Sequence, residues 1–182
     1  MSSFPKRHAL SLIVALAAAT RLQAQAAMPP NLSDPEVAHV AVTANTIDIE
    51  AARFAKTRTR NAEVTAFANT MITDHTAVNA QATALAGRLH VTPAANAVSQ
   101  SLIAGAAQAH TALKRLHGAA FNRAYMEREV AYHQAVLDAL DGVLIPTTDN
   151  ADLKKLLQDV RPAIAAHLAH ARQLLASLGA AR

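Results

Sequence analysis

The chain of 182 residues contains no cysteine and no tryptophan, and only 3% of its residues are aromatic. Without cysteine it cannot form a disulfide, a thiolate metal site or a cysteine nucleophile. It also lacks a glycine-rich phosphate loop, a nucleophile elbow and a recognisable Ser/His/Asp set. These absences argue against the corresponding classes of enzyme, and the sequence favours a non-catalytic protein.

Alanine dominates what is present. The chain has 45 alanines within a hydrophobic content of 52%, and few runs of β-branched residues. Alanine has the highest helix propensity, whereas strands are enriched in β-branched and aromatic residues. The composition therefore predicts an all-α protein whose helices approach each other closely.

The first 26 residues have the pattern of a secretory signal peptide. Lys6 and Arg7 precede an apolar run from Ala9 to Ala19, and an A-x-A site ends at Ala26. The run is too short to span a bilayer. We therefore expect an exported protein that is periplasmic or associated with the envelope of a bacterium, with an extended leader over residues 27–33.

The charge of the mature chain is expected to be close to neutral. Removing residues 1–26 takes three bases from the 17 Lys and Arg and none of the 13 acids, which leaves 14 bases and 13 acids. No basic stripe interleaved with aromatic residues remains, which argues against nucleic-acid binding. A protein partner and homo-oligomerisation both stay open.

Apolar residues recur at three and four positions in four long segments, which predicts four helices. Their expected ranges are 34–58, 61–90, 119–144 and 151–178. Pro162 is expected to kink the last of them. A long connection at 91–118 carries a shorter helix that is expected to cross an end or a side of the molecule. Two helical hairpins joined by one long crossover predict a ferritin-like four-helix bundle over residues 34–178.

Short segments in this order resemble an exported bacterial ferritin-like family, catalogued as domain of unknown function 4142, whose members are often labelled outer membrane proteins. The resemblance spans about residues 34–178. It rests on residues 48–50, 64–68, 71–75, 121–125 leading to His133, and 166–168.

The resemblance implies an acid in the first helix, which falls on Asp48 with Glu50 close by, and histidines at positions 75, 133 and 167. The chain departs from the family pattern at Asn122 and Tyr132, where acids are common, and at Glu129, which is usually apolar.

The same histidines stand out from the spacing alone, because His75, His133 and His167 each occupy an inward position of a different helix. Glu129, four residues before His133, lies on the same face of that helix. Ionisable groups rarely go inside a protein unless they are paired, hydrogen-bonded or bound to a metal. The pair of inward Glu-x-x-His motifs that the di-iron bundles carry does not occur, because the single Glu-x-x-His spacing, Glu36 to His39, lies at the start of the first helix. The set His75, His133, His167 and Asp48 suits one Zn, Cu or Fe ion, with Glu129, Glu50 and Asp74 as secondary candidates.

Axial counting gives a further expectation. From the turn near residue 148, Glu129 and His167 are both nineteen residues away, whereas His133 is fifteen. Glu129 is thus expected to face His167 better than His133 does, by an offset of about 6 Å. Uneven hairpin ends would remove the mismatch.

Three functions remain open from the sequence. The first is an exported bundle that binds a metal ion through its interior histidines. The second is a structural or interaction module of the envelope in which the same polar residues form a hydrogen-bonded core that fixes helix register. The third is a ferritin-like oxidase or peroxide-consuming enzyme, against which the missing Glu-x-x-His pairs count.

Overall fold

The computed structural model describes residues 31–180, and this part of the chain contains helices and connecting segments but no strand. The prediction of an all-α fold is confirmed. The expected signal peptide and residues 27–30 of the leader lie outside the described residues. The elements are α1 (Asp34–Arg58), α2 (Ala62–Leu89), α3 (Ala97–Lys114), α4 (Gly118–Ala139), the π-helix η2 (Leu140–Leu144), α5 (Ile145–Thr147) and α6 (Ala151–Ala180).

The helix starts follow from local sequence. Ser33 and Glu36 form a capping box at the start of α1, where Glu36 Oε2 accepts a hydrogen bond of 2.9 Å from the Ser33 backbone N–H. The Asn61 side chain accepts a hydrogen bond from the Val64 N–H and caps α2. These caps satisfy N–H groups that have no partner within the helix.

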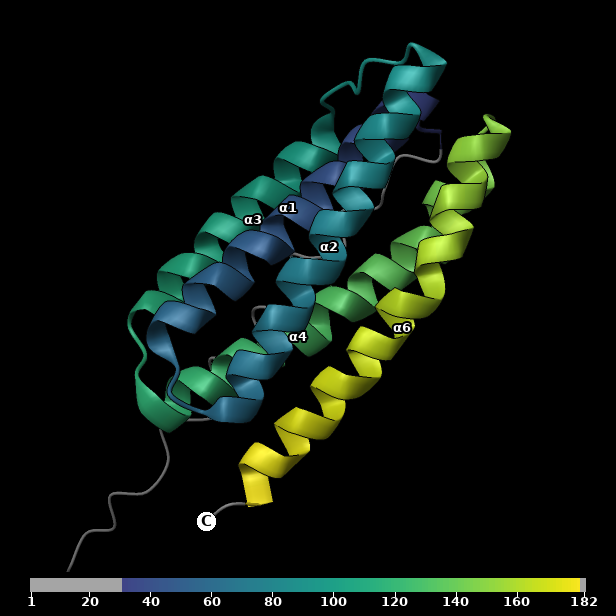
Figure 1. Cartoon of the computed structure of the whole chain (residues 1–182). Helices are drawn as coiled ribbons and strands as arrows, with labels where there is room; N and C mark the ends of the chain where they lie inside the picture. Colours follow the sequence, from purple (N-terminus) through teal and green to yellow (C-terminus); the bar gives the residue numbers. More distant parts are fainter. Residues whose placement is uncertain (1–30, 181–182) are drawn as a thin grey trace, which may run out of the picture.

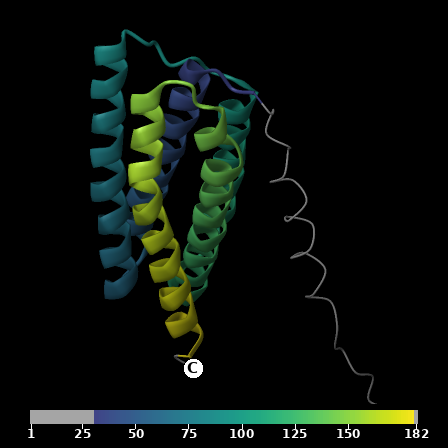
Figure 2. The same cartoon turned by 90° about the vertical axis from the view of Figure 1, so that its right-hand side faces the viewer.

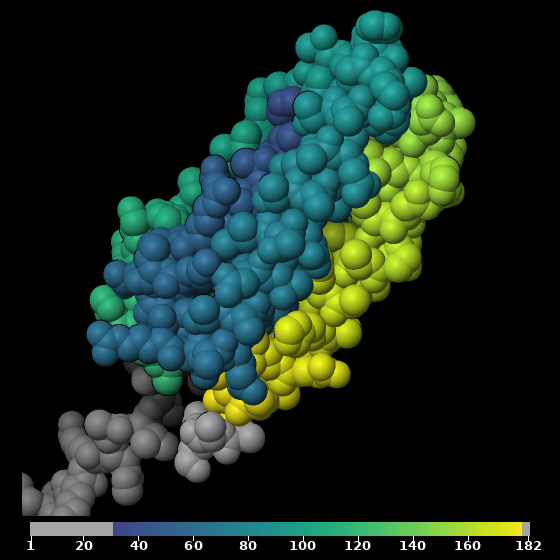
Figure 3. Space-filling model, in the orientation of Figure 1, coloured from purple at the N-terminus to yellow at the C-terminus, as the bar shows by residue number. Residues whose placement is uncertain are grey.

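The long helices lie side by side along a common axis (Figures 1 and 2). The pair α1 and α2 and the pair α4 and α6 each form a hairpin with extensive contacts, and the two hairpins meet mainly where α2 packs on α6. On the face drawn in Figure 3, side chains of α2 and α6 meet along the length of the molecule. Within residues 31–180, no helix is long and apolar enough to cross a membrane.

The connection between the hairpins differs from the short helix expected there. Helix α3 has 18 residues and runs along the side of the molecule against α1 and α4 (Figure 1). Only Ser99 and Leu113 of α3 are buried, so this helix covers the hairpins rather than joining their core.

Neither proline near the second hairpin breaks its helix. The chain continues past α4 through η2, where the Ile145 N–H bonds to the Leu140 carbonyl five residues earlier, and Pro146 lies in the first turn of α5. A proline is tolerated there because a first-turn N–H needs no partner within the helix. Pro162 lies inside α6, which runs unbroken from Ala151 to Ala180.

The core consists of two apolar clusters with a polar layer between them. One cluster gathers residues such as Val37, Leu85 and Leu157, and the other gathers residues such as Phe67 and Phe121. Between the two clusters along the helices lie buried polar side chains, which are Asp48, His75, Glu129, His133 and His167. This layer is where the ionisable groups of different helices meet.

Candidate metal centre

Four helices each supply one of the principal candidate ligands. Asp48 comes from α1, His75 from α2, His133 from α4 and His167 from α6. Their exposed fractions are 0%, 3%, 1% and 7%. The structure therefore brings together, away from water, the four residues that the sequence singled out.

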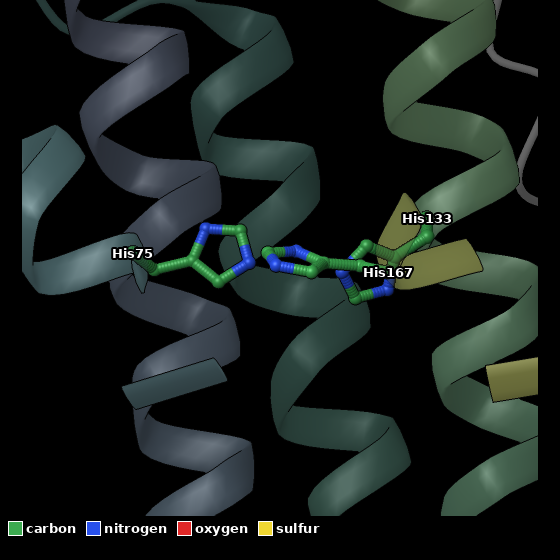
Figure 4. Close-up of side chains that lie close together, drawn as sticks. All are labelled: His75, His133 and His167. Atoms are coloured by element: carbon green, nitrogen blue, oxygen red, sulfur yellow. The ribbon is translucent and has the colours of Figure 1, made fainter. Parts of the chain in front are cut away.

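The three imidazole rings form a nearly regular triangle. Their centroids are 5.8 Å apart for His75 and His133, 5.3 Å for His75 and His167, and 5.5 Å for His133 and His167. Figure 4 shows His75 reaching towards the other two rings from the opposite side of the centre. One ring nitrogen of each histidine lies within 4.8 Å of those of the other two.

On each ring, one nitrogen is held by an acceptor at the edge of the centre. His75 Nδ1 lies 2.7 Å from Asn45 Oδ1, His133 Nδ1 lies 3.0 Å from the Glu129 backbone carbonyl, and His167 Nε2 lies 2.9 Å from Asp74 Oδ2. Because each partner atom is an acceptor, each of these nitrogens carries the proton. In a neutral imidazole the other nitrogen then presents a lone pair.

The remaining atoms all face the centre without a hydrogen-bond partner. Within the described part of the chain, none is found for His75 Nε2, His133 Nε2, His167 Nδ1 or Asp48 Oδ2. Asp48 Oδ2 lies 3.1 Å from His75 Nε2 and 3.9 Å from His133 Nε2. Buried polar atoms of native proteins rarely lack a partner, so these four require an explanation, as does Oε2 of Glu129, which groups with Asp48 and His133.

A metal ion accounts for all four atoms. Zinc binds imidazole nitrogen and carboxylate oxygen at about 2.0–2.2 Å, so two ligands of a tetrahedral ion are about 3.4 Å apart. The Asp48 separations of 3.1 and 3.9 Å bracket this spacing. Outer acceptors that fix the tautomer of a histidine are also typical of metal ligands. The residues present therefore fit one borderline ion such as Zn, Cu or Fe.

Arg128 of α4 is the countercharge of the centre. Its Nη1 lies 2.7 Å from Asp48 Oδ1 and also bonds Glu129 Oε1, and its guanidinium stacks 4.3 Å over the Tyr132 ring. The Arg128 side chain is only 13% exposed. Arg128 therefore holds the outer oxygen of Asp48 and leaves its other oxygen, Oδ2, facing the histidines.

The protonation states follow from burial and these contacts. Burial raises the pKa of Asp48, but the contact with His75 and the charge of Arg128 outweigh it and hold that pKa below its usual range. Burial raises the pKa of Glu129 well above its ordinary value. Burial lowers the pKa of His133 to about 4 and also lowers that of His167. The centre thus contains an ionised Asp48 and neutral imidazoles at His133 and His167, the forms that bind metals.

The expectation that Glu129 faces His167 is wrong. Glu129 bonds Arg128, whereas the His133 ring meets the His167 ring. Counting from residue 148 included the extended segment before α6, which starts only at Ala151. Moreover, side chains lean towards the N-terminus of their helix, so His133 and His167 on antiparallel helices lean towards each other and close the remaining offset.

The secondary candidates Glu50 and Asp74 both lie outside the centre. Glu50 is exposed and takes no part in the centre, whereas the half-exposed Asp74 holds His167 from outside. Asn45 and Arg128 were not identified from the sequence. Their spacing could have indicated that both lie near the inward face. Asn45 lies one helical turn before Asp48, and Arg128 lies three residues after Tyr125, at the edge of the inward stripe.

The lowered pKa of His133 predicts a pH-dependent stability of the metal-free protein. Between about pH 6.5 and pH 4 the unfolded chain protonates this histidine and the folded chain does not, so stability falls as pH falls through this window. His167 acts in the same direction. The raised pKa of Glu129 has the opposite effect on stability, and the pKa of Asp48 lies below this pH range.

Replacing His133 with glutamine isolates the contribution of His133 to this pH dependence. Between pH 6 and pH 4.5 the free energy of unfolding should fall with pH more steeply in the wild type than in His133→Gln. The two slopes should differ by up to about 1.4 kcal/mol per pH unit, which corresponds to the uptake of one proton on unfolding. Urea denaturation with a chelator present measures both slopes, and His170→Gln at an exposed position is the control. Equal slopes in wild type and His133→Gln would contradict a neutral buried His133.

Comparison with known proteins gives a family without an assigned activity. A search of the curated proteins and of the solved structures returned no match. The family model described as Domain of unknown function (DUF4142) matches residues 18–174, which include all four residues of the centre and all of their helices except the last six residues of α6. The chain therefore belongs to this DUF4142 family.

Proposed function

We propose that this protein is an exported metal-binding protein that holds one transition-metal ion through His75, His133, His167 and Asp48. One observation carries the proposal. The four side chains come from four helices, their outer atoms are all engaged, and their inner atoms converge without a partner in the part of the chain that the structure describes. A cation is the kind of ligand that satisfies three lone pairs and a carboxylate oxygen at once.

The helix arrangement supports a ferritin-like four-helix bundle as the scaffold. The pairs α1–α2 and α4–α6 are hairpins, and the long connection that contains α3 joins them, as in bundles with one crossover. Such bundles place metal ligands on the facing sides of their helices. Export is supported by the basic start, apolar run and A-x-A site of residues 1–26.

A purely structural role for the polar layer explains less of the geometry. If the layer only fixed helix register, hydrogen bonds would satisfy its inner atoms as they do the outer ones. His133 Nε2 is 3.9 Å from Asp48 Oδ2, too far for a hydrogen bond, and His167 Nδ1 has no partner among the described residues. A proton on His75 Nε2 would satisfy only that nitrogen and Asp48 Oδ2, and would leave the inner nitrogens of His133 and His167 without a partner.

An oxidase of the di-iron type is also less well supported. Two ions in one bundle need bridging carboxylates. Here Arg128 already occupies the outer oxygen of Asp48 and Oε1 of Glu129. The arrangement therefore favours a single ion.

Metal content and titration test the proposal. The mature wild type, stripped with a chelator and titrated with Zn, Cu and Fe, should bind one ion per chain, and His75→Ala and His167→Ala should each weaken binding at least a hundredfold. His170→Ala, an exposed histidine three residues after His167, should bind as the wild type does. Unchanged binding in His75→Ala and His167→Ala would refute the metal centre.

A further inference from the structure

An apolar cavity of about 210 Å³ lies next to the candidate metal centre. Helices α1, α2 and α6 line it together with the end of α4 and η2. It occupies the half of the molecule that contains the start of α1, the end of α2 and the C-terminal end of the second hairpin. Its walls consist almost wholly of alanine, valine, leucine and isoleucine side chains.

On the first hairpin, the cavity begins one helical turn from the candidate ligands. Asn45, three residues before Asp48, and Val78, three residues after His75, both line it. A step of three residues is about 4.5 Å along a helix. Asn45 also bonds His75 Nδ1, so one side chain belongs to both the cavity wall and the centre.

The second hairpin repeats this relation. Val136, three residues after His133, and Ile164, three residues before His167, line the same cavity. Because the two hairpin partners run in opposite directions, all four of these neighbours lie on the same axial side of the centre. The cavity is therefore stacked directly on one face of the four ligands.

The chemistry of the wall selects an uncharged ligand. Only four lining residues have polar side chains, namely Asp34, Asn45, Thr83 and Asn150. Asp34 accepts hydrogen bonds from the Asp149 and Asn150 N–H groups, and Asn150 accepts two from the start of α6. These oxygens are engaged by backbone N–H groups, and the lining contains no Lys, Arg or His side chain that could hold an anion.

The π-helix η2 is a second, independent indication that this cavity is a binding site. Leu140 and Leu144, the first and last residues of η2, both face the cavity. Single π-turns inside α-helices occur frequently at functional sites. Here the turn shapes one wall of the space beside the metal ligands.

We infer that this cavity binds an uncharged apolar small molecule, aromatic or aliphatic, against the face of the metal centre. A closed apolar cavity of about 150 Å³ accommodates benzene. The present cavity, about 210 Å³ and partly open at the exposed lining residues Thr83 and Pro93, suits a molecule of about eight carbon atoms. Binding itself requires no metal. That the ligand meets a bound ion rests on the proposed function.

Titration of the metal-free full-length mature protein with ethylbenzene tests the cavity. Ethylbenzene should raise the melting temperature and cause saturable NMR shifts, whereas benzoate, a charged molecule of similar size, should do neither. Ala82→Leu, which fills the cavity from α2, should weaken ethylbenzene binding at least tenfold. Ala80→Leu, two residues earlier at an exposed position outside the wall, should bind as the wild type does.

Absence of saturable ethylbenzene binding in the wild type, or full binding in a folded Ala82→Leu variant, would overturn the inference. If circular dichroism shows that Ala82→Leu is unfolded, Ala41→Leu on the α1 wall replaces it with the same expectation. Adding ethylbenzene to the Co²⁺-loaded protein tests the contact with the centre, and its visible absorption bands should shift. Unchanged bands despite binding would refute the contact alone, whereas a failure to bind Co²⁺ at all would count against the metal proposal and leave the cavity result standing.

Discussion

Replacing Arg128 with methionine is expected to lower the free energy of unfolding of the metal-free protein by about 3–5 kcal/mol. The change keeps much of the apolar stem of the side chain and removes the charge between Asp48 and Glu129, which are both fully buried. A buried ion pair contributes little net stability, but removing one partner leaves an uncompensated charge in the interior. Urea denaturation at pH 7 with a chelator present measures the effect.

Arg123 is the matched control for this substitution. It lies on the same helix and pairs with Glu127 across one turn, but both side chains are about half exposed. Exposed pairs of this kind contribute little, so Arg123→Met should change stability by less than about 0.5 kcal/mol. Adding Asp48→Asn to Arg128→Met should recover part of the loss. A loss of stability in Arg128→Met no larger than in Arg123→Met would show that Arg128 is not the countercharge.

Saturation with the bound metal is expected to stabilise the folded protein by about 4 kcal/mol when free metal is a thousandfold above its dissociation constant. The reason is that the proposed ligands come from four helices, so the unfolded chain cannot present the same ligand set. Thermal unfolding with and without metal measures this stabilisation, which should rise with metal concentration.

The His75→Ala variant should lose most of the metal-dependent stabilisation. His75 is the principal candidate ligand from α2, and its Nε2 lies 3.1 Å from Asp48 Oδ2. His170→Ala, which removes an exposed histidine of α6, should retain the effect. An equal metal-induced rise in melting temperature in His75→Ala and wild type would place the ion elsewhere.

Helical periodicity predicted the elements well because each helix carries its own register. The stripes that ran through His75, His133 and His167 also predicted that these side chains point inward, and they do. The Asn61 cap of α2 is equally local, because its partner Val64 is three residues away. These features depend on residues close together in the sequence.

Features that depend on contacts between helices could not be predicted in the same way. The sequence shows Arg128 as one base among 17, and only the packing of α4 against α1 reveals that it is buried between two carboxylates. The wrong pairing of Glu129 with His167 arose because a count along the chain ignores the direction in which side chains lean. The bounds of α3 could not be read from the sequence because a helix on the surface has a weak apolar stripe, with only two of its 18 residues buried.

The position of the ion itself tests the central claim most directly. X-ray diffraction data from the metal-loaded protein, collected at the absorption edge of the metal, should show one anomalous peak per chain. The proposed centre predicts this peak about 2.0–2.2 Å from His75 Nε2, His133 Nε2, His167 Nδ1 and Asp48 Oδ2. A metal-loaded crystal whose only peaks lie at the surface, with the three rings hydrogen-bonded to one another or to water instead, would contradict it.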